Sequence, residues 1–206
     1  MFPLIFNSAT TIRDQAVRVP KFLGGLAEIG RRGRKSATRL STDLSAAIIT
    51  YSYSMNPDLI SIFIEHESTY LPEPPIGFFP ASSYTGLVIY AKGAYPVHGE
   101  DETGQLAAAL FPRIYDTDMN LIVDSEMIDP EFLSFWGVVR YAEGEDFLLE
   151  SDRIGTYPLV TMAREIFGTN RCDVIIPTDV GLKLLADERN RRLITQGRVV
   201  IICDFP

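Results

Sequence analysis

The sequence is poor in the residue types that build metal sites and disulfide frameworks. Its 206 residues include two cysteines, two histidines and one tryptophan. A structural zinc ion needs about four cysteine or histidine ligands, usually in closely spaced pairs, and neither type of residue is paired in this way. No apolar run approaches the roughly 18 residues of a membrane-spanning helix. We therefore expect no metal or other cofactor, and at most a peripheral contact with a membrane.

Sequence signatures of common catalytic sites are also missing. Gly25 and Gly30 have the spacing of a phosphate-binding loop, but the lysine and the hydroxyl that should follow them are absent. No serine lies in the G-x-S-x-G pattern. His66 and His98 are each a possible general base, but no activated nucleophile stands beside them. We expect a protein that is not an enzyme; a cleft that gathers either histidine with two acids would favour catalysis instead.

The charge is divided unevenly along the chain. It contains 19 basic and 27 acidic residues, which gives a net charge of −8. Residues 1–40 carry eight of the basic and only two of the acidic residues, so the remainder has a net charge of −14. The acidic total disfavours nucleic acid as a partner, and the opposite charges of the two parts predict head-to-tail self-association.

Two short groups of charged residues stand out within this division. One is a basic turn that could contact an acidic protein surface, an anionic lipid or nucleic acid, and the other is the acidic tip of a loop. Solvation is the ordinary role of such groups. The candidate interaction residues are Arg31, Arg32, Arg34, Lys35, Glu100, Asp101 and Glu102.

The first 80 residues predict a domain of helix and antiparallel strands. Thr10 or Thr11 can begin a helix that runs to about Val19, and Pro20 separates it from a second helix over 21–29. Two runs rich in β-branched and aromatic residues flank an Asn-Pro-Asp turn and predict strands at 45–54 and 59–64. The proline-rich stretch 70–80 is a domain boundary or a crossing loop.

Residues 81–206 predict a mixed α/β domain. The expected strands are 84–90, 110–115, 121–124, 138–142, 173–176 and 198–203. Of the expected helices, Asp129 and Pro130 begin 131–136 and Gly137 ends it, Thr156 and Pro158 begin 156–167, and Thr178 caps 178–190. The second and third of these strands are expected to form a hairpin. The last two strands, which are short and wholly apolar, predict a terminal βαβ unit with parallel neighbours. The fold class is therefore α+β.

Two further expectations follow from this assignment. If the last two strands are parallel neighbours, Cys172 and Cys203 lie too far apart for a disulfide. The pattern Asp116-x-Asp118-x-Asn120-x-x-x-Asp124 follows the start of a calcium-binding loop, but its sixth and twelfth positions are leucine and methionine in place of glycine and glutamate. We expect a polar hairpin turn there instead.

The order of these strands and turns is similar to that in a known group of proteins. Tyr84-Thr-Gly-Leu-Val-Ile-Tyr-Ala-Lys-Gly93, Leu110-Phe-Pro-Arg-Ile-Tyr-Asp-Thr-Asp118, Val138-Val-Arg-Tyr-Ala142, Arg171-Cys-Asp-Val-Ile-Ile-Pro177 and Arg198-Val-Val-Ile-Ile-Cys-Asp204 fall in one series. This series resembles bacterial envelope proteins related to the flagellar ring protein FlgT and the small outer-membrane lipoproteins that share its domains. The resemblance covers about residues 84–204.

The resemblance implies a periplasmic protein, without enzymatic activity, that docks with other envelope or flagellar-motor components. The sequence departs from this group in two ways. It shows no export leader or lipidation cysteine, so a cytoplasmic location stays open. Residues 94–106 also form a longer and more acidic segment than the short connection usual in the group. The alternative is a cytoplasmic ligand-binding domain or enzyme. Its site would lie at the carboxyl ends of the βαβ strands, near Pro177, Thr178, Asp179 and Asp204.

Overall fold

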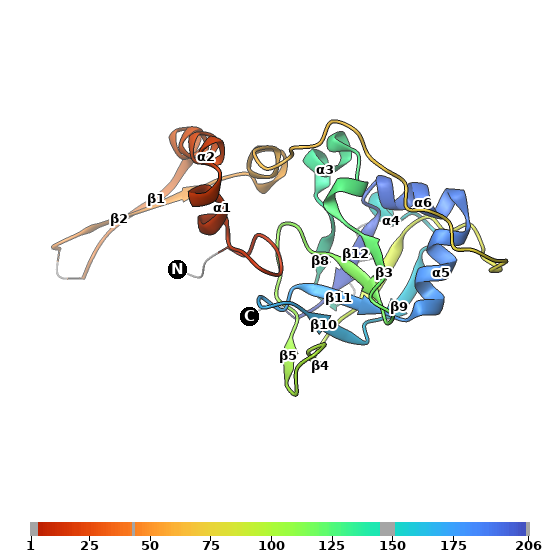
Figure 1. Ribbon diagram of the computed structural model, residues 1–206. Coiled ribbons are helices and arrows are strands. Elements are labelled where there is room, and N and C mark those ends of the chain that lie inside the picture. The colour runs from red at the N-terminus through yellow and green to blue at the C-terminus, as the bar shows by residue number, and fades with distance from the viewer. Residues whose placement is uncertain (1–3, 43, 145–150, 205–206) are drawn as a thin grey trace.

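The computed structural model describes residues 4–42, 44–144 and 151–204. Figure 1 shows an α/β body and, apart from it, a two-stranded hairpin that extends away beside two helices. The N-terminal elements are the helices α1 (Ile12–Arg18) and α2 (Pro20–Arg32), the strands β1 (Arg34–Leu40) and β2 (Ala47–Ser52), and the helical turn η1 (Met55–Leu59).

The two N-terminal helices confirm the prediction from capping signals. The Thr11 hydroxyl accepts a hydrogen bond from the backbone N–H of Asp14, and the Asp14 carboxylate accepts one from the backbone N–H of Thr11. These bonds form a capping box at the start of α1, and the one from the Thr11 backbone contributes most to lowering the pKa of Asp14. Pro20 occupies the first turn of α2, where a missing N–H leaves no helical bond unmade.

The remaining elements form two four-stranded sheets and the two-stranded sheet β4-β5, with helices around them. The strands are β3 (Leu87–Tyr90), β4 (Ala94–Pro96), β5 (Thr103–Gln105), β6 (Ile114–Asp116), β7 (Leu121–Val123), β8 (Arg140–Ala142), β9 (Leu159–Met162), β10 (Glu165–Phe167), β11 (Asp173–Ile176) and β12 (Val199–Ile202). The helices are η2 (Ser125–Met127), α3 (Pro130–Trp136), α4 (Ser151–Ile154), α5 (Thr178–Ala186) and α6 (Glu188–Thr195).

A parallel sheet in the order β8-β12-β3-β9 lies at the centre of the body. Alternate residues of its two central strands enter different clusters: Ile89 and Ile201 join the main core, whereas Val88 and Val200 pack with Ile154 of α4 on the other face. Every residue of β12 is fully buried. Burial on both faces explains why these strands are continuous apolar runs.

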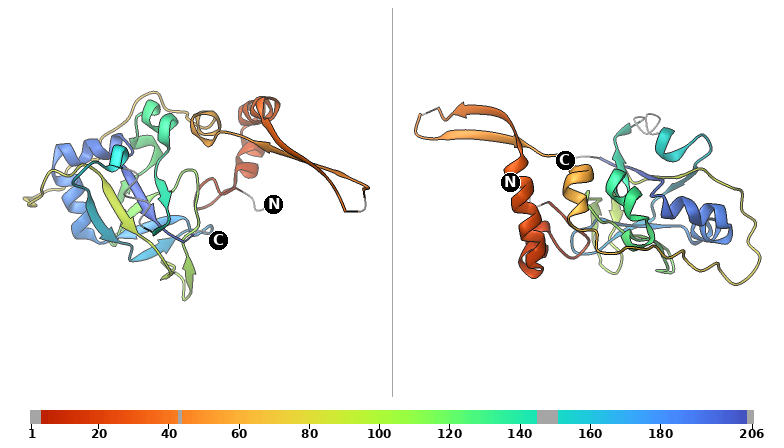
Figure 2. Two further views of the ribbon diagram at one scale, coloured as in Figure 1. Left: turned by 180° about the vertical axis from the view of Figure 1, so that it is seen from behind. Right: turned by 90° about the horizontal axis from the view of Figure 1, so that it is seen from above.

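A second sheet, in the order β10-β11-β6-β7, mixes parallel and antiparallel pairs. Its buried side chains share the main core with Leu184 of α5 and Ile194 of α6. Figure 2 shows these two helices against the sheets, on the side of the body away from the hairpin. The antiparallel hairpins, the mixed sheet and the separate helices confirm the α+β fold class.

Several local predictions are confirmed. Residues of β6 and β7 form the expected hairpin. The Asp129 side chain accepts a hydrogen bond from the backbone N–H of Glu131, Pro130 begins α3, and Gly137 ends it with a φ of 76°. These three residues therefore act as the N-cap, the first helical residue and the C-cap that their types favour.

The predicted βαβ unit is correct in its order and wrong in its pairing. β11, the helices α5 and α6, and β12 follow one another in the chain, but β11 pairs with β6 and β10, whereas β12 pairs with β3 and β8. The two strands thus lie in different sheets. The helical segment between them is also divided, because Asp187 ends α5 and caps α6 through the backbone N–H of Arg189.

Three other predictions are wrong. The strand expected at 59–64 is a helical turn in which Ile60 and Phe63 are buried. The helix expected at 156–167 is replaced by β9 and β10. The side chain of Thr178 does not cap α5; it donates a hydrogen bond to Asp118 over 3.0 Å.

Candidate functional site

The N-terminal hairpin, residues 34–52, is the most distinctive surface of the described molecule, and we call it the arm. β1 and β2 pair antiparallel, with Thr38 opposite Ile49 and Leu40 opposite Ala47. Apart from Ala37, which is half-buried, every residue of the two strands is exposed. In the views of Figures 1 and 2 the arm extends away from the rest of the molecule, so both of its faces are open.

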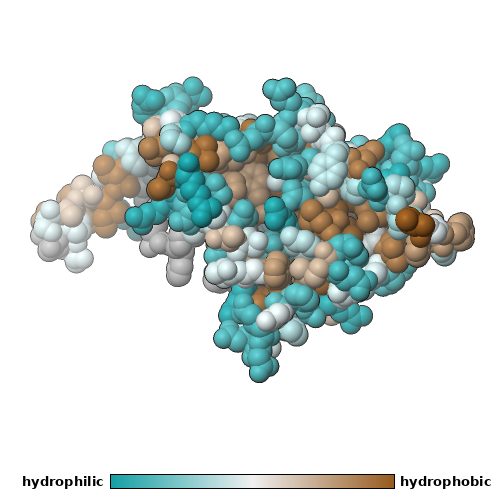
Figure 3. Space-filling view, viewed as in Figure 1, coloured by the Kyte–Doolittle hydropathy of each residue, from teal (hydrophilic) through white to brown (hydrophobic). Residues whose placement is uncertain are grey.

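The two faces of the arm differ in chemistry. Residues directly opposite each other share a face, so Leu40, Ala47, Thr38, Ile49 and Tyr51 lie on one side together with Lys35. Leu40 is 64% exposed and Ile49 is 45% exposed. The opposite face holds Arg34, Ala37, Arg39, Ile48, Thr50 and Ser52. The first face is the more apolar and carries one lysine, and we call it the apolar face; the second carries two arginines beside Ile48, and we call it the basic face. Figure 3 shows brown, apolar surface on part of the arm.

The root of the arm is tightly built. Gly33 joins α2 to β1, and the ring of Tyr53 lies so close that a Cβ atom at this glycine would overlap it. The Tyr53 ring also stacks with that of Tyr51, with 6.5 Å between their centroids. A residue with a side chain at position 33 would have to displace this aromatic pair, so the sequence needs glycine where the helix turns into the strand.

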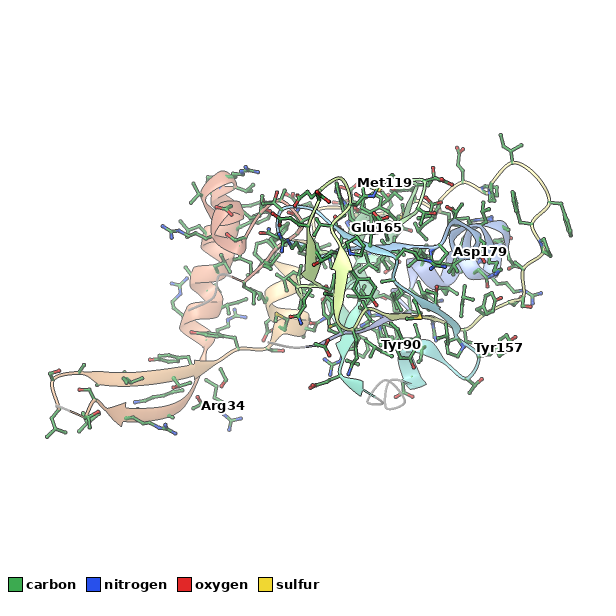
Figure 4. All side chains as sticks on the ribbon, turned by 90° about the horizontal axis from the view of Figure 1, so that it is seen from below. Arg34, Tyr90, Met119, Tyr157, Glu165 and Asp179 are labelled. Atoms are coloured by element: carbon green, nitrogen blue, oxygen red, sulfur yellow. The ribbon has the colours of Figure 1, made fainter. Side chains whose placement is uncertain are left out.

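The structure divides the predicted basic group between two elements. Arg31 and Arg32 end α2 and both bind the carboxylate of Glu28, at 2.7 and 2.9 Å. Arg34 and Lys35 begin β1, and Figure 4 places Arg34 at the root of the arm. The expectation of one flexible turn is therefore wrong, because the chain passes directly from a helix into a strand. Only the second pair belongs to the arm.

The predicted acidic group lies between the two strands of another small hairpin, formed by β4 and β5. The tip carries Glu100 and Asp101, which are exposed. Glu102 binds Arg171 over 2.6 Å, which ties the hairpin to the turn before β11. The acidic tip is thus held by an ion pair at its base, and its other two carboxylates face solvent.

A cleft of about 190 Å³ lies between the N-terminal segment and the body. Its apolar walls come from Phe6, Phe63 and Phe111, which pack with ring centroids 4.8 to 6.3 Å apart. Its polar lining includes Asn7, Glu65, His66, Arg113, Asp124, Ser125 and Glu126. The cleft therefore gathers one of the two predicted histidines with three acids. This is the arrangement named above as favouring catalysis, so the cleft is a candidate catalytic or ligand site and stands against the expectation of a non-enzymatic protein, which stays a prediction.

The charges in this cleft are largely paired with each other. Arg113 binds Asp124 over 2.6 Å. Burial lowers the pKa of the guanidinium, but the hydrogen bond and charge of Asp124 outweigh it, so the pKa of Arg113 is raised. Lys21 binds Glu65. Nε2 of His66 lies 2.8 Å from the carbonyl oxygen of Ile128 and therefore donates to it, which leaves Nδ1 as the acceptor in the neutral ring.

The second histidine lies elsewhere. Nδ1 of His98 lies 2.5 Å from Oε2 of Glu165, and its ring meets the edge of Phe167. Both partners belong to β10, so the histidine fastens the β4–β5 hairpin to the mixed sheet. The structure does not bring His66 and His98 together.

A comparison with family models gives the chain its family. Residues 86–205 match the model of the second domain of the Treponema pallidum protein Tp0624. This segment is more than half of the 206 residues. The chain belongs to this family. The region that matches the Tp0624 second domain contains both four-stranded sheets, and the arm lies before it. A comparison with curated proteins finds no match. The boundary expected at residue 80 and the resemblance to FlgT stay predictions.

The polar hairpin turn expected at residues 116–124 lies in the Tp0624 second-domain region, and its side chains bond their own backbone as predicted. Asp116 is 2% exposed. Its carboxylate accepts hydrogen bonds from the backbone N–H groups of Asp118 and Asn120 and from the Asn120 side chain, at 2.9 to 3.0 Å. This bonding uses both oxygens within the turn. In the described ranges, no cluster of three or more histidine, cysteine or acidic residues is arranged to hold a metal ion.

The two cysteines are unpaired and buried, as predicted, although for a different reason. They flank strands of separate sheets and not neighbouring strands of one sheet. Burial contributes most to raising the pKa of each thiol, to about 11 for Cys203. Beside Cys172, Asp173 is fully buried; burial raises the pKa of this carboxyl, although it accepts a hydrogen bond from the Arg113 backbone.

The alternative site at the ends of β11 and β12 is not one cleft, because these strands lie in different sheets. Pro177 borders an open depression whose other lining residues include Tyr90, Val160 and Met162. Asp204 instead accepts a hydrogen bond from the backbone N–H of Gly93. Thr178 donates a hydrogen bond to Asp118 and Asp179 accepts one from Lys183, so the polar groups expected at this edge are bound to other partners.

Sequence reasoning missed the arm as a surface. It placed residues 34 and 35 in a turn and predicted strands at 45–54 and 59–64 on either side of an Asn-Pro-Asp turn, whereas β2 pairs with β1. The local signal was weak, because Lys35-Ser-Ala-Thr-Arg-Leu40 contains one β-branched residue and does not alternate apolar and polar residues. In the described part of the chain, no helix is both long and apolar enough to cross a membrane.

Proposed function

We propose that the protein is a non-enzymatic assembly protein that binds another polypeptide through its arm. The observation that carries this proposal is an isolated hairpin with both faces exposed and large apolar side chains on it, such as Leu40, Leu44 and Ile48. A two-stranded hairpin is marginally stable in water unless a further strand or a packed surface supports it. Clustered exposed apolar residues typically mark contact surfaces.

The charge of the arm lies on β1 and supports contact of that strand with an acidic surface. Within the described chain, no ion pair involves Arg34, Lys35 or Arg39. Uncompensated positive charge on a projecting element accelerates encounter with a negative partner and sets its orientation. The remainder of the chain, at a net charge of −14, is itself such a surface.

The proposed setting is the cell envelope, as a periplasmic or outer-membrane-associated component of a larger assembly such as the flagellar motor. This part of the proposal is supported by the resemblance of residues 84–204 to envelope proteins related to FlgT. Fractionation of the source cells should recover the protein with periplasmic or outer-membrane markers. Recovery with cytosolic markers would overturn the setting and leave the role of the arm to be judged separately.

A photo-crosslinking experiment tests the role of the arm. A photoreactive phenylalanine analogue replaces Tyr51 on the arm or, as a control, Tyr157, which is 59% exposed and lies far from the arm in Figure 4. We expect irradiation of the source cells to give a discrete protein adduct from position 51 and none from position 157. Equal labelling at both positions, or no adduct at position 51, would contradict the proposal.

The cleft around His66 supports a second candidate function, the binding of a small ligand. Its aromatic walls and the carboxylate of Glu126 suit a ligand with an apolar ring and an ammonium group. Benzylamine is a suitable probe, and it should raise the melting temperature of the protein but not that of the Glu126→Gln variant. An equal shift in both proteins, or no shift in either, would remove this candidate.

A further inference from the structure

The two edges of the arm carry very different side chains. β1 holds all the charges of the two strands, on Arg34, Lys35 and Arg39. β2 has the sequence Ala-Ile-Ile-Thr-Tyr-Ser and no charged residue. Charged residues on an edge strand oppose pairing with another strand, and an uncharged, β-branched edge favours it. The edge formed by β1 is therefore protected against pairing with a further strand, and the edge formed by β2 is open to it.

We infer that β2 pairs antiparallel with β2 of a second copy of this chain, which joins two arms into a four-stranded sheet. The inference rests on the proposed function and names the partner of the arm. The new order would be β1-β2-β2-β1, with the basic strands outermost. Such a sheet has the additional strands that a single hairpin lacks.

The faces of the arm exclude every second register of this pairing, and among the registers that remain we place Ile49 opposite Ile49. Opposite residues in an antiparallel pair share a face. The apolar faces of both copies come together when Ile49 lies opposite Ile49 of the second copy, since Ala47 then lies opposite Tyr51. A shift of one residue would put the apolar face of one arm beside the basic face of the other. The matched register joins the two apolar faces into one continuous surface.

Charge and hydrogen bonding favour a second copy over an acidic strand as the occupant. The six residues of β2 offer about six backbone hydrogen bonds to an antiparallel neighbour. The two β1 strands would be three strand spacings apart, about 14 Å, which exceeds the Debye length of about 8 Å at physiological salt. Repulsion between the basic strands is therefore screened, whereas an acidic strand beside neutral β2 would gain no directly opposite charge.

Sedimentation of the purified full chain tests the inference. We expect a monomer–dimer equilibrium that persists in about 1 M salt, because backbone hydrogen bonds and apolar contacts are weakly screened. Ile49→Lys places two like charges opposite each other and should raise the dimer dissociation constant at least about tenfold. Thr38→Lys adds the same charge on the same face of β1, one strand away, and should change it by less than about threefold.

Cysteine crosslinking gives a second readout that does not depend on affinity. The native cysteines are buried, so Ile49→Cys should give a disulfide-linked dimer under mild oxidation. Ile48→Cys, its neighbour on the other face, should not, because residue 48 lies opposite residue 50 in the matched register. A purified chain that is monomeric at all concentrations, a dimer that dissociates in salt, or binding of anionic vesicles by a monomer would overturn the inference. Adducts of the arm with a different polypeptide in cells would then still support the proposed function.

Discussion

Replacing Arg153 should destabilise the body more than any surface change. This residue is 2% exposed, and its guanidinium donates hydrogen bonds to the carbonyl oxygens of Gly197, Trp136 and Gly137 at 2.7 to 2.9 Å. It also lies 5.3 Å from the centre of the Trp136 ring. The side chain thus connects α4 with the end of α3 and the residues before β12.

The magnitude follows from the acceptors that would lose their donors. Arg153→Met keeps the length and apolar stem but leaves three carbonyl groups without this partner. Each buried unsatisfied group costs about 1–3 kcal/mol. Because water can reach part of the vacated space, we expect a total loss of about 3–5 kcal/mol, comparable to breaking a buried ionic contact. That is a large fraction of the roughly 5–15 kcal/mol typical of a domain.

Urea unfolding followed by circular dichroism measures this loss. We expect a lower midpoint with an unchanged slope, since the surface exposed on unfolding stays the same. Arg164→Met is the matched control, because Arg164 is exposed, and it should change the unfolding free energy by less than about 0.5 kcal/mol. A loss below about 1 kcal/mol for Arg153→Met would refute the assigned role.

Three further predictions concern buried polar groups. Burial raises the pKa of Asp173, so the folded chain keeps a proton that the unfolded chain loses near pH 3.8. The free energy of unfolding should therefore fall as the pH rises through the raised pKa, by up to about 1.4 kcal/mol per pH unit. Urea unfolding of the Asp173→Asn variant at different pH values should lack this dependence. Intact mass should be the same with and without reductant, and alkylation of Cys203 at pH 8 should become fast only after unfolding. Asp116→Ala should lower the unfolding free energy by about 2 kcal/mol, and calcium calorimetry of the native chain should show no binding heat.

Local signals predicted much of the fold because local bonding decided those elements. The capping residues Thr11 and Asp129 and the break at Pro20 act through neighbours within a few residues, so the sequence is sufficient. The buried strands of the body were equally clear, because β11 and β12 consist of Val and Ile runs without polar residues, apart from Asp173.

Elements that depend on distant contacts were misread. Thr156 and Pro158 suggested a helix start, yet Leu159–Met162 forms β9, which pairs with β3. Its residues alternate between buried and exposed because one face of the strand packs inward and the other faces solvent. Residues 59–64 contain β-branched residues, but the burial of Ile60 and Phe63, three positions apart, has the helical period. Which sheet receives β11 or β12 is decided by packing that no local pattern encodes.

The candidate site was predicted only in part, for a related reason. The residues Arg34 and Lys35 were selected for their charge, but the importance of the arm comes from the apolar residues beside them, which a sequence pattern assigns equally well to a core. The cleft around His66 combines residues more than 50 positions apart. Neither surface can be recognised before the chain is folded.

The uneven protection of the arm limits how many chains can join. A ribbon whose two borders were both free of charge could add chains without end, as fibrils do. With Arg34, Lys35 and Arg39 along one border, each molecule has a single place for a neighbour, and growth stops when that place is filled. The same basic side chains would then limit the assembly to two chains and keep the exposed apolar hairpin soluble.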